Sequence, residues 1–169
     1  RRRAKRGEMK KPRLDRATLR RWLLRLLAGW GLLSVGPVLL LRFVDPPTSA
    51  FMVQRKLEAA QHQEKGFVLR QLWVPRSRIS VHLQRALIAA EDQKFAEHFG
   101  FDLGAIEDAV EDRLDGKSRR GASTLTQQVA KNLFLWSGKS FLRKGLEAYF
   151  TVLLELFWSK ARILEVHLN

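Results

Sequence analysis

The chain has 169 residues, 46% of them hydrophobic, which is enough for one domain with a core of its own. It contains no cysteine, which excludes a disulfide framework, a thiol nucleophile and a metal held by cysteine. Its net charge of +14 is uneven, because residues 1–21 hold eleven basic and only two acidic residues.

A basic tail of this kind can bind nucleic acid, but the apolar segment that follows it favours a membrane. Residues 22–44 carry no charge apart from Arg25 and Arg42, whose stems can bring their charges to the two interfaces of a bilayer. A buried core helix and a cleaved signal peptide are the alternatives. The glycines and Pro37 suit a membrane helix better than a soluble one, and no A-x-A cleavage site follows Val44.

The chain therefore divides into three parts in our prediction. Residues 1–21 are a basic cytoplasmic tail, 22–44 a transmembrane helix and 45–169 a domain on the outer side, because basic flanks stay in the cytoplasm. No nucleic-acid partner is expected. The chain starts at Arg1 without Met and stops at Asn169 within a helical pattern, so we expect a fragment that lacks the C-terminal part of its domain.

The outer part shows helical patterns and no alternating strand pattern, which predicts a mainly α fold. Residues 140–157 are apolar nearly all round, as expected of a helix at the centre of a domain. Within 80–95, Leu83, Leu87 and Ala90 recur at helical spacing and are expected to face the core. Helices are predicted over 51–65, 80–95, 102–114, from Thr124, over 140–157 and from Ser159, with an extended stretch at 67–73 and a basic loop at 115–121.

Two glutamates stand in apolar surroundings. Glu91 follows an apolar helix face, where burial would raise its pKa toward the range useful for a general base. Glu147 enters the most apolar helix and is preceded by Arg143 and Lys144. Two such acids are the minimal apparatus for glycosyl chemistry, although a solvated side chain or an ordinary ion pair would also explain each of them. His98 has no metal-like partner at helical spacing and is interpreted as structural.

The run at 121–132, GASTLTQQVAKN, presents hydroxyls, amides and free backbone N–H groups at a helix start. Together with Lys131 and the later Lys139, this is an arrangement that a pyrophosphate would fit. Thr124 and Gln127 also form a capping box, so a capped helix by itself would explain the run. The basic residues would then be a solvated face.

Four segments resemble, in order, the signatures of the peptidoglycan glycosyltransferase family. Residues 89–102, AAEDQKFAEHFGFD, resemble the first signature with its Glu-Asp pair, Phe, His, Gly and Asp. The others are GASTLTQQVAKNLFL at 121–135, RKGLE at 143–147 and SKARILEVHLN at 159–169. The resemblance covers residues 22–169 and is closest to the monofunctional biosynthetic enzymes of Gram-negative bacteria.

This resemblance implies a lysozyme-like, mainly helical fold and an inverting transfer that joins the units of lipid II through β-1,4 bonds. Glu91 would take the proton from the 4-hydroxyl of the acceptor sugar, whose oxygen attacks the growing strand and displaces undecaprenyl pyrophosphate. Glu147 would stabilise that leaving group, with a divalent cation such as Mg²⁺ or Mn²⁺ as its candidate ligand. The residues implied to bind the substrate or its phosphates are Ser123, Thr124, Gln128, Lys131, Lys139, Arg143 and Lys144.

The resemblance also implies a single-pass protein of the bacterial inner membrane, with a cytoplasmic N-terminus and a periplasmic catalytic domain. The implied partners are lipid II, the growing glycan strand and membrane lipid, together with cell-division or penicillin-binding proteins. Two residues depart from the family's pattern: Lys139 stands where Arg is frequent, and His167 stands where Tyr is usual.

Two other functions stay open from the residues themselves. A lytic glycosidase of lysozyme type would share the fold and one essential glutamate but would cleave glycan with water. It needs no basic pyrophosphate site, so the basic cluster of Lys131, Lys139, Arg143 and Lys144 favours transfer. A non-catalytic membrane protein that binds anions through its tail would leave Glu91 and Glu147 unexplained.

Overall fold

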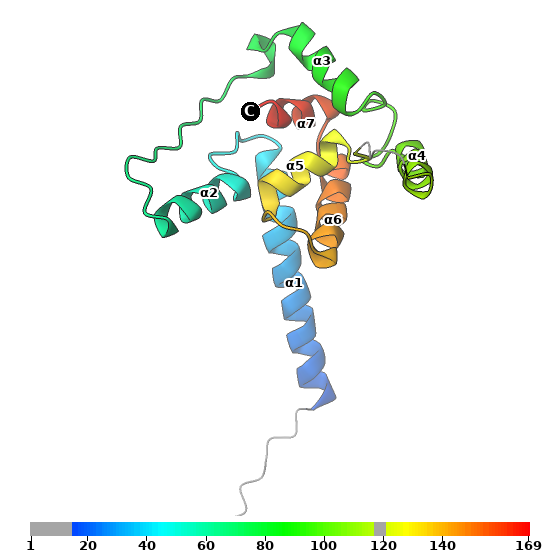
Figure 1. The fold of residues 1–169 in the computed structure, drawn as a ribbon. Coiled ribbons are helices and arrows are strands. Elements are labelled where there is room, and N and C mark those ends of the chain that lie inside the picture. The colour runs from blue at the N-terminus through cyan, green and yellow to red at the C-terminus, as the bar shows by residue number, and fades with distance from the viewer. Residues whose placement is uncertain (1–14, 117–120) are drawn as a thin grey trace, which may run out of the picture. The chain divides into compact units, whose positions relative to one another are not determined.

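The computed structural model describes residues 15–116 and 121–169, and the regular structure of this part is entirely helical (Figure 1). The predicted mainly α fold class is confirmed. The basic loop predicted at 115–121 lies largely outside the described residues. The chain divides into two compact units, residues 1–36 and 37–169. The elements are α1 (Arg16–Leu41), α2 (Ala50–Gln61), a 3₁₀ turn (Arg76–Arg78), α3 (Val81–Glu91), α4 (Leu103–Leu114), α5 (Leu125–Phe134), α6 (Phe141–Phe157) and α7 (Lys160–His167).

Helix α1 is long and apolar enough to cross a membrane, a test that the core helix of a soluble protein or a signal sequence would also pass. It begins at Arg16 and not at residue 22, because strong helix formers fill its first turns. It ends at Leu41, short of the predicted Val44. Within the second unit, the guanidinium of Arg162 donates to the carbonyl oxygens of Leu41 at 3.1 and 3.2 Å and of Val44 at 2.8 Å, which satisfies the end of the helix.

The second unit is built around α5, which packs against α6, α7 and α2. Leu125 of α5, Leu154 of α6 and Ile163 of α7 are fully buried where these helices meet. The ring of Phe134 stacks on that of Phe150 with centroids 4.6 Å apart, which joins α5 to α6. The core therefore forms around α5, and the candidate anion-binding segment 121–132 includes the N-terminus of this helix.

Helix α6 is buried on one face only, so the prediction that it is buried all round is wrong. Leu153 and Leu154 face the core, whereas Leu142, Val152 and Leu156 are 71%, 39% and 60% exposed. The helix packs along a single stripe, as a surface helix does.

Helix α3 ends at Glu91 and not at residue 95, because Asp92 leaves the helical conformation with φ −159° and ψ 75°. The core face predicted for this helix is also wrong. Leu83 and Ala90 are exposed, and the buried residue is Gln84, whose amide donates to backbone carbonyls of the preceding turn. Hydrogen bonding here decides the orientation that hydrophobicity failed to predict.

The segment predicted to be extended, 67–73, has no regular secondary structure and is held at its end by the C-terminal residues. The side chain of Asn169 accepts a hydrogen bond from the Val74 amide at 2.7 Å and donates one to the Val74 carbonyl at 3.0 Å. The carboxylate of Glu165 accepts from the backbone N–H of Arg76 at 2.8 Å. These three bonds fix the entry of the chain into α3.

We expect Gly100→Ala to destabilise the protein more than Gly66→Ala. Both glycines have positive φ, +79° and +80°, so both substitutions carry a backbone cost of about 1–3 kcal/mol. A Cβ at Gly100 would lie 2.6 Å from Cγ2 of Thr151, whereas nothing lies within 4 Å at Gly66. Unfolding by denaturant, followed by helical circular dichroism, measures both changes. Equal losses of unfolding free energy would show that the chain relaxes around position 100.

Candidate functional site

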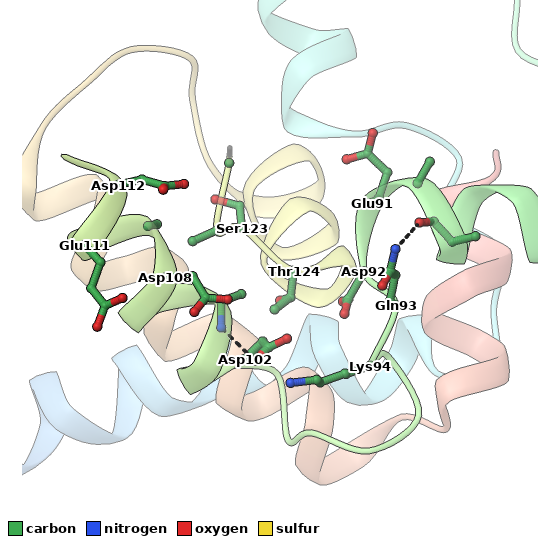
Figure 2. A pocket seen from close by; sticks show the side chains of 16 residues that line it. Glu91, Asp92, Gln93, Lys94, Asp102, Asp108, Glu111, Asp112, Ser123 and Thr124 are labelled. Carbon is green, nitrogen blue, oxygen red and sulfur yellow. Dashed lines mark hydrogen bonds between the residues drawn. The ribbon is translucent and has the colours of Figure 1, made fainter. Parts of the chain in front are cut away.

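A cavity of about 820 Å³ lies beside Glu91, between the end of α3, helix α4 and residues 121–124 (Figure 2). Glu91 is exposed there, and its Oε2 accepts a hydrogen bond from Nε2 of Gln128 on α5 at 3.0 Å. The exposed Ser123 lines the same cavity. The burial expected for Glu91 is therefore wrong, because the last turn of α3 faces the cavity and not the core.

The described residues that line this cavity are mainly acidic, and the basic residues predicted to bind the phosphates, Lys131, Lys139, Arg143 and Lys144, are not among them. In Figure 2, Glu91 lies on one side of the cavity and Asp108 and Asp112 of α4 lie on the other. Among the described residues that line it, Lys94 is the one basic side chain. The described part of the lining thus offers a phosphate one cationic partner, Lys94.

Asp92, next to Glu91, is a buried carboxylate with one partner six residues along the chain and another 33 residues away. Its Oδ2 accepts from the backbone N–H of Leu125 at 2.9 Å, and its Oδ1 accepts from Nε2 of His98 at 2.7 Å. The other ring nitrogen of His98 accepts from the Gly100 amide at 3.1 Å, which places the ring proton on Nε2. This structural role of Asp92 was not predicted from the sequence. The signal for it was an acidic residue placed directly after an apolar helix.

Helix α5 begins with the predicted capping box. The hydroxyl of Thr124 accepts from the Gln127 amide at 3.3 Å, and Oε1 of Gln127 accepts from the Thr124 amide at 3.1 Å. The same hydroxyl donates to the carbonyl of Gly100 at 2.7 Å, and Thr124 is 3% exposed. Because these bonds occupy the hydroxyl inside the protein, the substrate contact expected of Thr124 stays a prediction.

Glu147 forms a second cluster, buried in α6 with 3% of its surface exposed. Its Oε2 accepts from Nη1 of Arg143 at 2.6 Å and its Oε1 accepts from Nζ of Lys144 at 2.5 Å. Arg143 is largely covered and also donates through Nε to the carbonyl of Gly138 at 2.7 Å, whereas the side chain of Lys144 is half exposed. Two cations thus compensate one buried carboxylate.

The two other predicted lysines, Lys131 and Lys139, do not line the cavity beside Glu91. Lys131 follows Gln128 by one turn of α5, and its Nζ lies 5.7 Å from the ring centroid of Phe51. Lys139 is exposed in the connection between α5 and α6. The structure therefore joins Gln128 to Glu91 but does not bring the predicted phosphate-binding residues to the same cavity.

The surroundings of Glu147 do not fit the divalent cation that was expected there. Both carboxylate oxygens already bind positively charged groups, from Arg143 and Lys144, which would repel a metal ion. In the described residues, no three His, Asp or Glu side chains are grouped as metal ligands. Hard divalent cations take several oxygen ligands, and one occupied carboxylate does not supply them. We assign no step to a metal.

The chain matches the family model described as transglycosylase over residues 58–169. It is 56% identical over 152 residues to the biosynthetic peptidoglycan transglycosylase of Ectopseudomonas mendocina, covering 90% of this chain and 62% of the relative. The proteins of the same name from Pseudomonas savastanoi and Shewanella oneidensis are 60% and 53% identical, over 80% and 88% of this chain and 57% and 62% of the relatives. The chain spans about three-fifths of the length of these curated relatives.

Asp92→Asn is expected to lower the free energy of unfolding by about 1–3 kcal/mol, because an amide would turn its NH₂ toward the N–H of either His98 or Leu125. Asp102→Asn is the matched control. Oδ1 of Asp102 accepts from the Ala105 amide at 3.0 Å, a cap that Asn makes equally well. Denaturant unfolding of both variants compares the two sites, and equal stabilities would contradict the importance of the bonds to Asp92.

Proposed function

The chain belongs to the transglycosylase family, and from this membership we propose that it is a peptidoglycan glycosyltransferase of cell wall biosynthesis. It polymerises lipid II into β-1,4-linked glycan strands and releases undecaprenyl diphosphate. The observation that carries the proposal is the match over residues 58–169, which contains Glu91, Gln128 and Glu147. Relatives named as biosynthetic favour synthesis over the lytic and the non-catalytic alternatives.

Glu91 acts as the general base in this reaction. Its carboxylate takes the proton of the 4-hydroxyl on the acceptor sugar, and that oxygen forms a bond to the anomeric carbon of the growing strand. The bond from this carbon to the pyrophosphate oxygen breaks, and the electron pair leaves with undecaprenyl diphosphate. This displacement inverts the configuration at the anomeric carbon. Gln128 holds Oε2 of Glu91 at 3.0 Å, so Oε1, which has no hydrogen bond within the described residues, receives the proton.

The sugar and the phosphates bind to different parts of the site. The acidic cavity beside Glu91 suits an uncharged sugar, with Ser123 as a hydroxyl partner. Lys131, Lys139 and the half-exposed Lys144 supply the positive charge for the phosphates. Glu147 contributes indirectly, because its two ion pairs hold the cationic groups of Arg143 and Lys144 in fixed positions.

Helix α1 anchors the enzyme in the bacterial inner membrane in this proposal, with a cytoplasmic N-terminus and a periplasmic catalytic domain. Lipid II and the growing strand share this membrane through their lipid tails, so the anchor confines enzyme and substrate to one surface. Cell-division and penicillin-binding proteins are the partners proposed from the same location.

Glu91→Gln is expected to reduce polymerisation by about 10²–10⁴-fold, the usual contribution of a general base, while the binding of lipid II persists. Strand formation from labelled lipid II by the full-length protein in detergent measures the rate. Glu97→Gln is the matched control, because Glu97 is also exposed but does not line the cavity.

The results separate the role of Glu91 from the activity as a whole. Weak binding of lipid II with normal turnover of the bound fraction would contradict the role of Glu91 as base. A folded wild-type protein that makes no strands would contradict the proposed function itself.

Glu147→Gln should lower both stability and turnover, and Glu155→Gln only stability. Both carboxylates are buried and paired, Glu155 with Lys160 at 2.8 Å, so each substitution leaves a cation without its partner at a cost of about 3–5 kcal/mol. Only Glu147 holds cations assigned to the phosphates. Turnover per folded molecule, with the folded fraction taken from circular dichroism, compares the two. Equal turnover in both variants would show that Glu147 contributes to the stability of the core and not to turnover.

A further inference from the structure

Helix α2 packs against α5, the helix that carries Gln128 and Lys131. Residues three apart lie on one face of a helix, and on α2 Phe51 and Gln54 are such a pair. The ring of Phe51 lies beside the ammonium of Lys131, and Gln54 binds the connection between α5 and α6, which carries Lys139. One face of α2 thus contacts both segments from which these lysines come.

The amide of Gln54 makes three hydrogen bonds, which fix its orientation. Its Oε1 accepts from the backbone N–H of Ser137 at 2.8 Å, and its Nε2 donates to Oε1 of Glu58 at 2.8 Å and to Oγ of Ser137. A backbone N–H can only donate, so it selects the oxygen of the amide and leaves the NH₂ group for the two oxygens. Glu58, one turn further along α2, therefore holds the side chain of Gln54 against Ser137.

The connection between α5 and α6 is attached on both sides just before Lys139. Gln54 of α2 binds it at Ser137, and Nε of Arg143 on α6 donates to the carbonyl of Gly138 at 2.7 Å. Gly138 has a φ of +120°, which would strain a residue with a side chain, so the chain turns between its two attachments. Lys139 is the next residue, and the two attachments determine where its backbone lies.

Lys131 is held by a different interaction. Its Nζ lies 5.7 Å from the ring centroid of Phe51, within the range in which an ammonium is attracted to the face of an aromatic ring. A lysine side chain has many rotamers and loses this freedom when it binds a phosphate. A ring that limits these rotamers beforehand lowers the entropy cost of binding.

We propose that α2 is a positioning element of the transfer reaction, whose residues Phe51 and Gln54 hold two lysines in place for the phosphates of the substrate. The inference rests on the proposed function, which assigns Lys131 and Lys139 to the phosphates. Both residues of α2 precede residue 58, where the match to the transglycosylase model begins. Contacts that only packed α2 against α5 would change stability and leave substrate binding as it is.

The kinetic test is strand synthesis by the full-length protein in detergent, with KM for lipid II and kcat measured separately. Gln54→Met removes the hydrogen bonds at similar length, and should raise KM about 3–10-fold with kcat changed less than about twofold, because lost positioning weakens binding in the ground state and the transition state alike. Gln61→Met, the same substitution at the exposed end of the same helix, should keep the wild-type KM. An unchanged KM in Gln54→Met, or an equal rise in Gln61→Met, would overturn the proposal.

A double-mutant cycle tests the ring beside Lys131. Phe51→Leu removes the aromatic face and should raise KM about 2–5-fold, and Phe51→Tyr, which keeps the face, should retain the KM of the wild type. In a chain that already carries Lys131→Met, Phe51→Leu should raise KM no further, because the charge that the ring attracts is gone. A rise in KM of the same size in both backgrounds would show that the ring acts by packing, against the proposal.

Hydrogen exchange tests the attachment of the connection without any activity. The Ser137 amide should exchange faster in Gln54→Met and at the wild-type rate in Gln61→Met, because Oε1 of Gln54 accepts from this N–H. Equal rates in the two variants would overturn the role of Gln54. Ser137→Ala, which deletes only the hydroxyl, is the second variant if Gln54→Met does not fold, and it too should raise KM.

The outcomes separate this inference from the proposed function. Circular dichroism gives the folded fraction, by which every kcat is corrected. A folded wild type that makes no strands would overturn the proposed function. Strand synthesis with KM for lipid II unchanged in Gln54→Met and Phe51→Leu, whether or not the folded fraction falls, would overturn only the positioning role of α2.

Discussion

The site depends on the buried carboxylate of Asp92, which binds Nε2 of His98 and the first amide of α5. A buried charge without such partners would cost several kcal/mol, so this carboxylate permits essentially one arrangement of α3, the loop that follows and α5. Glu91 and Gln128 are attached to these same elements. Their contact at 3.0 Å is therefore a consequence of the bond between Asp92 and Leu125, which are one and three residues from them along the chain.

The two glutamates of the site have opposite surroundings. Glu91 is open to an acidic cavity and has an uncharged amide as its partner, which suits a group that must exchange a proton with a substrate. Glu147 is a buried residue of α6 that is paired with two cations, which suits a group that holds positive charges in fixed positions. In the proposed reaction, these two surroundings place the sugar chemistry at Glu91 and the phosphate binding near Glu147.

The positions of most helices could be predicted from capping residues and apolar periodicity, as Thr124 and Ser140 illustrate. The orientation of α3 could not be predicted, because Gln84 is buried in place of Leu83. The pattern of apolar residues does not reveal a polar side chain that is buried with its hydrogen bonds made. The motifs likewise indicated Glu91 and Glu147 as the important acids. The surroundings of Glu91 include a contact with Gln128, 37 residues away, which no local pattern encodes, whereas the ion pairs of Glu147 are made with Arg143 and Lys144 of the same motif.

The bonds between Asn169 and Val74 have a kinetic consequence, because their partners are 95 residues apart. Contacts of such long range form late, since a large loop has to close first. A ribosome makes Val74 long before Asn169, so the irregular segment at 67–75 emerges without the residue that fixes it. During synthesis this segment lacks these bonds until Asn169, just beyond α7, has been made, and until then the path of the chain into α3 is not fixed.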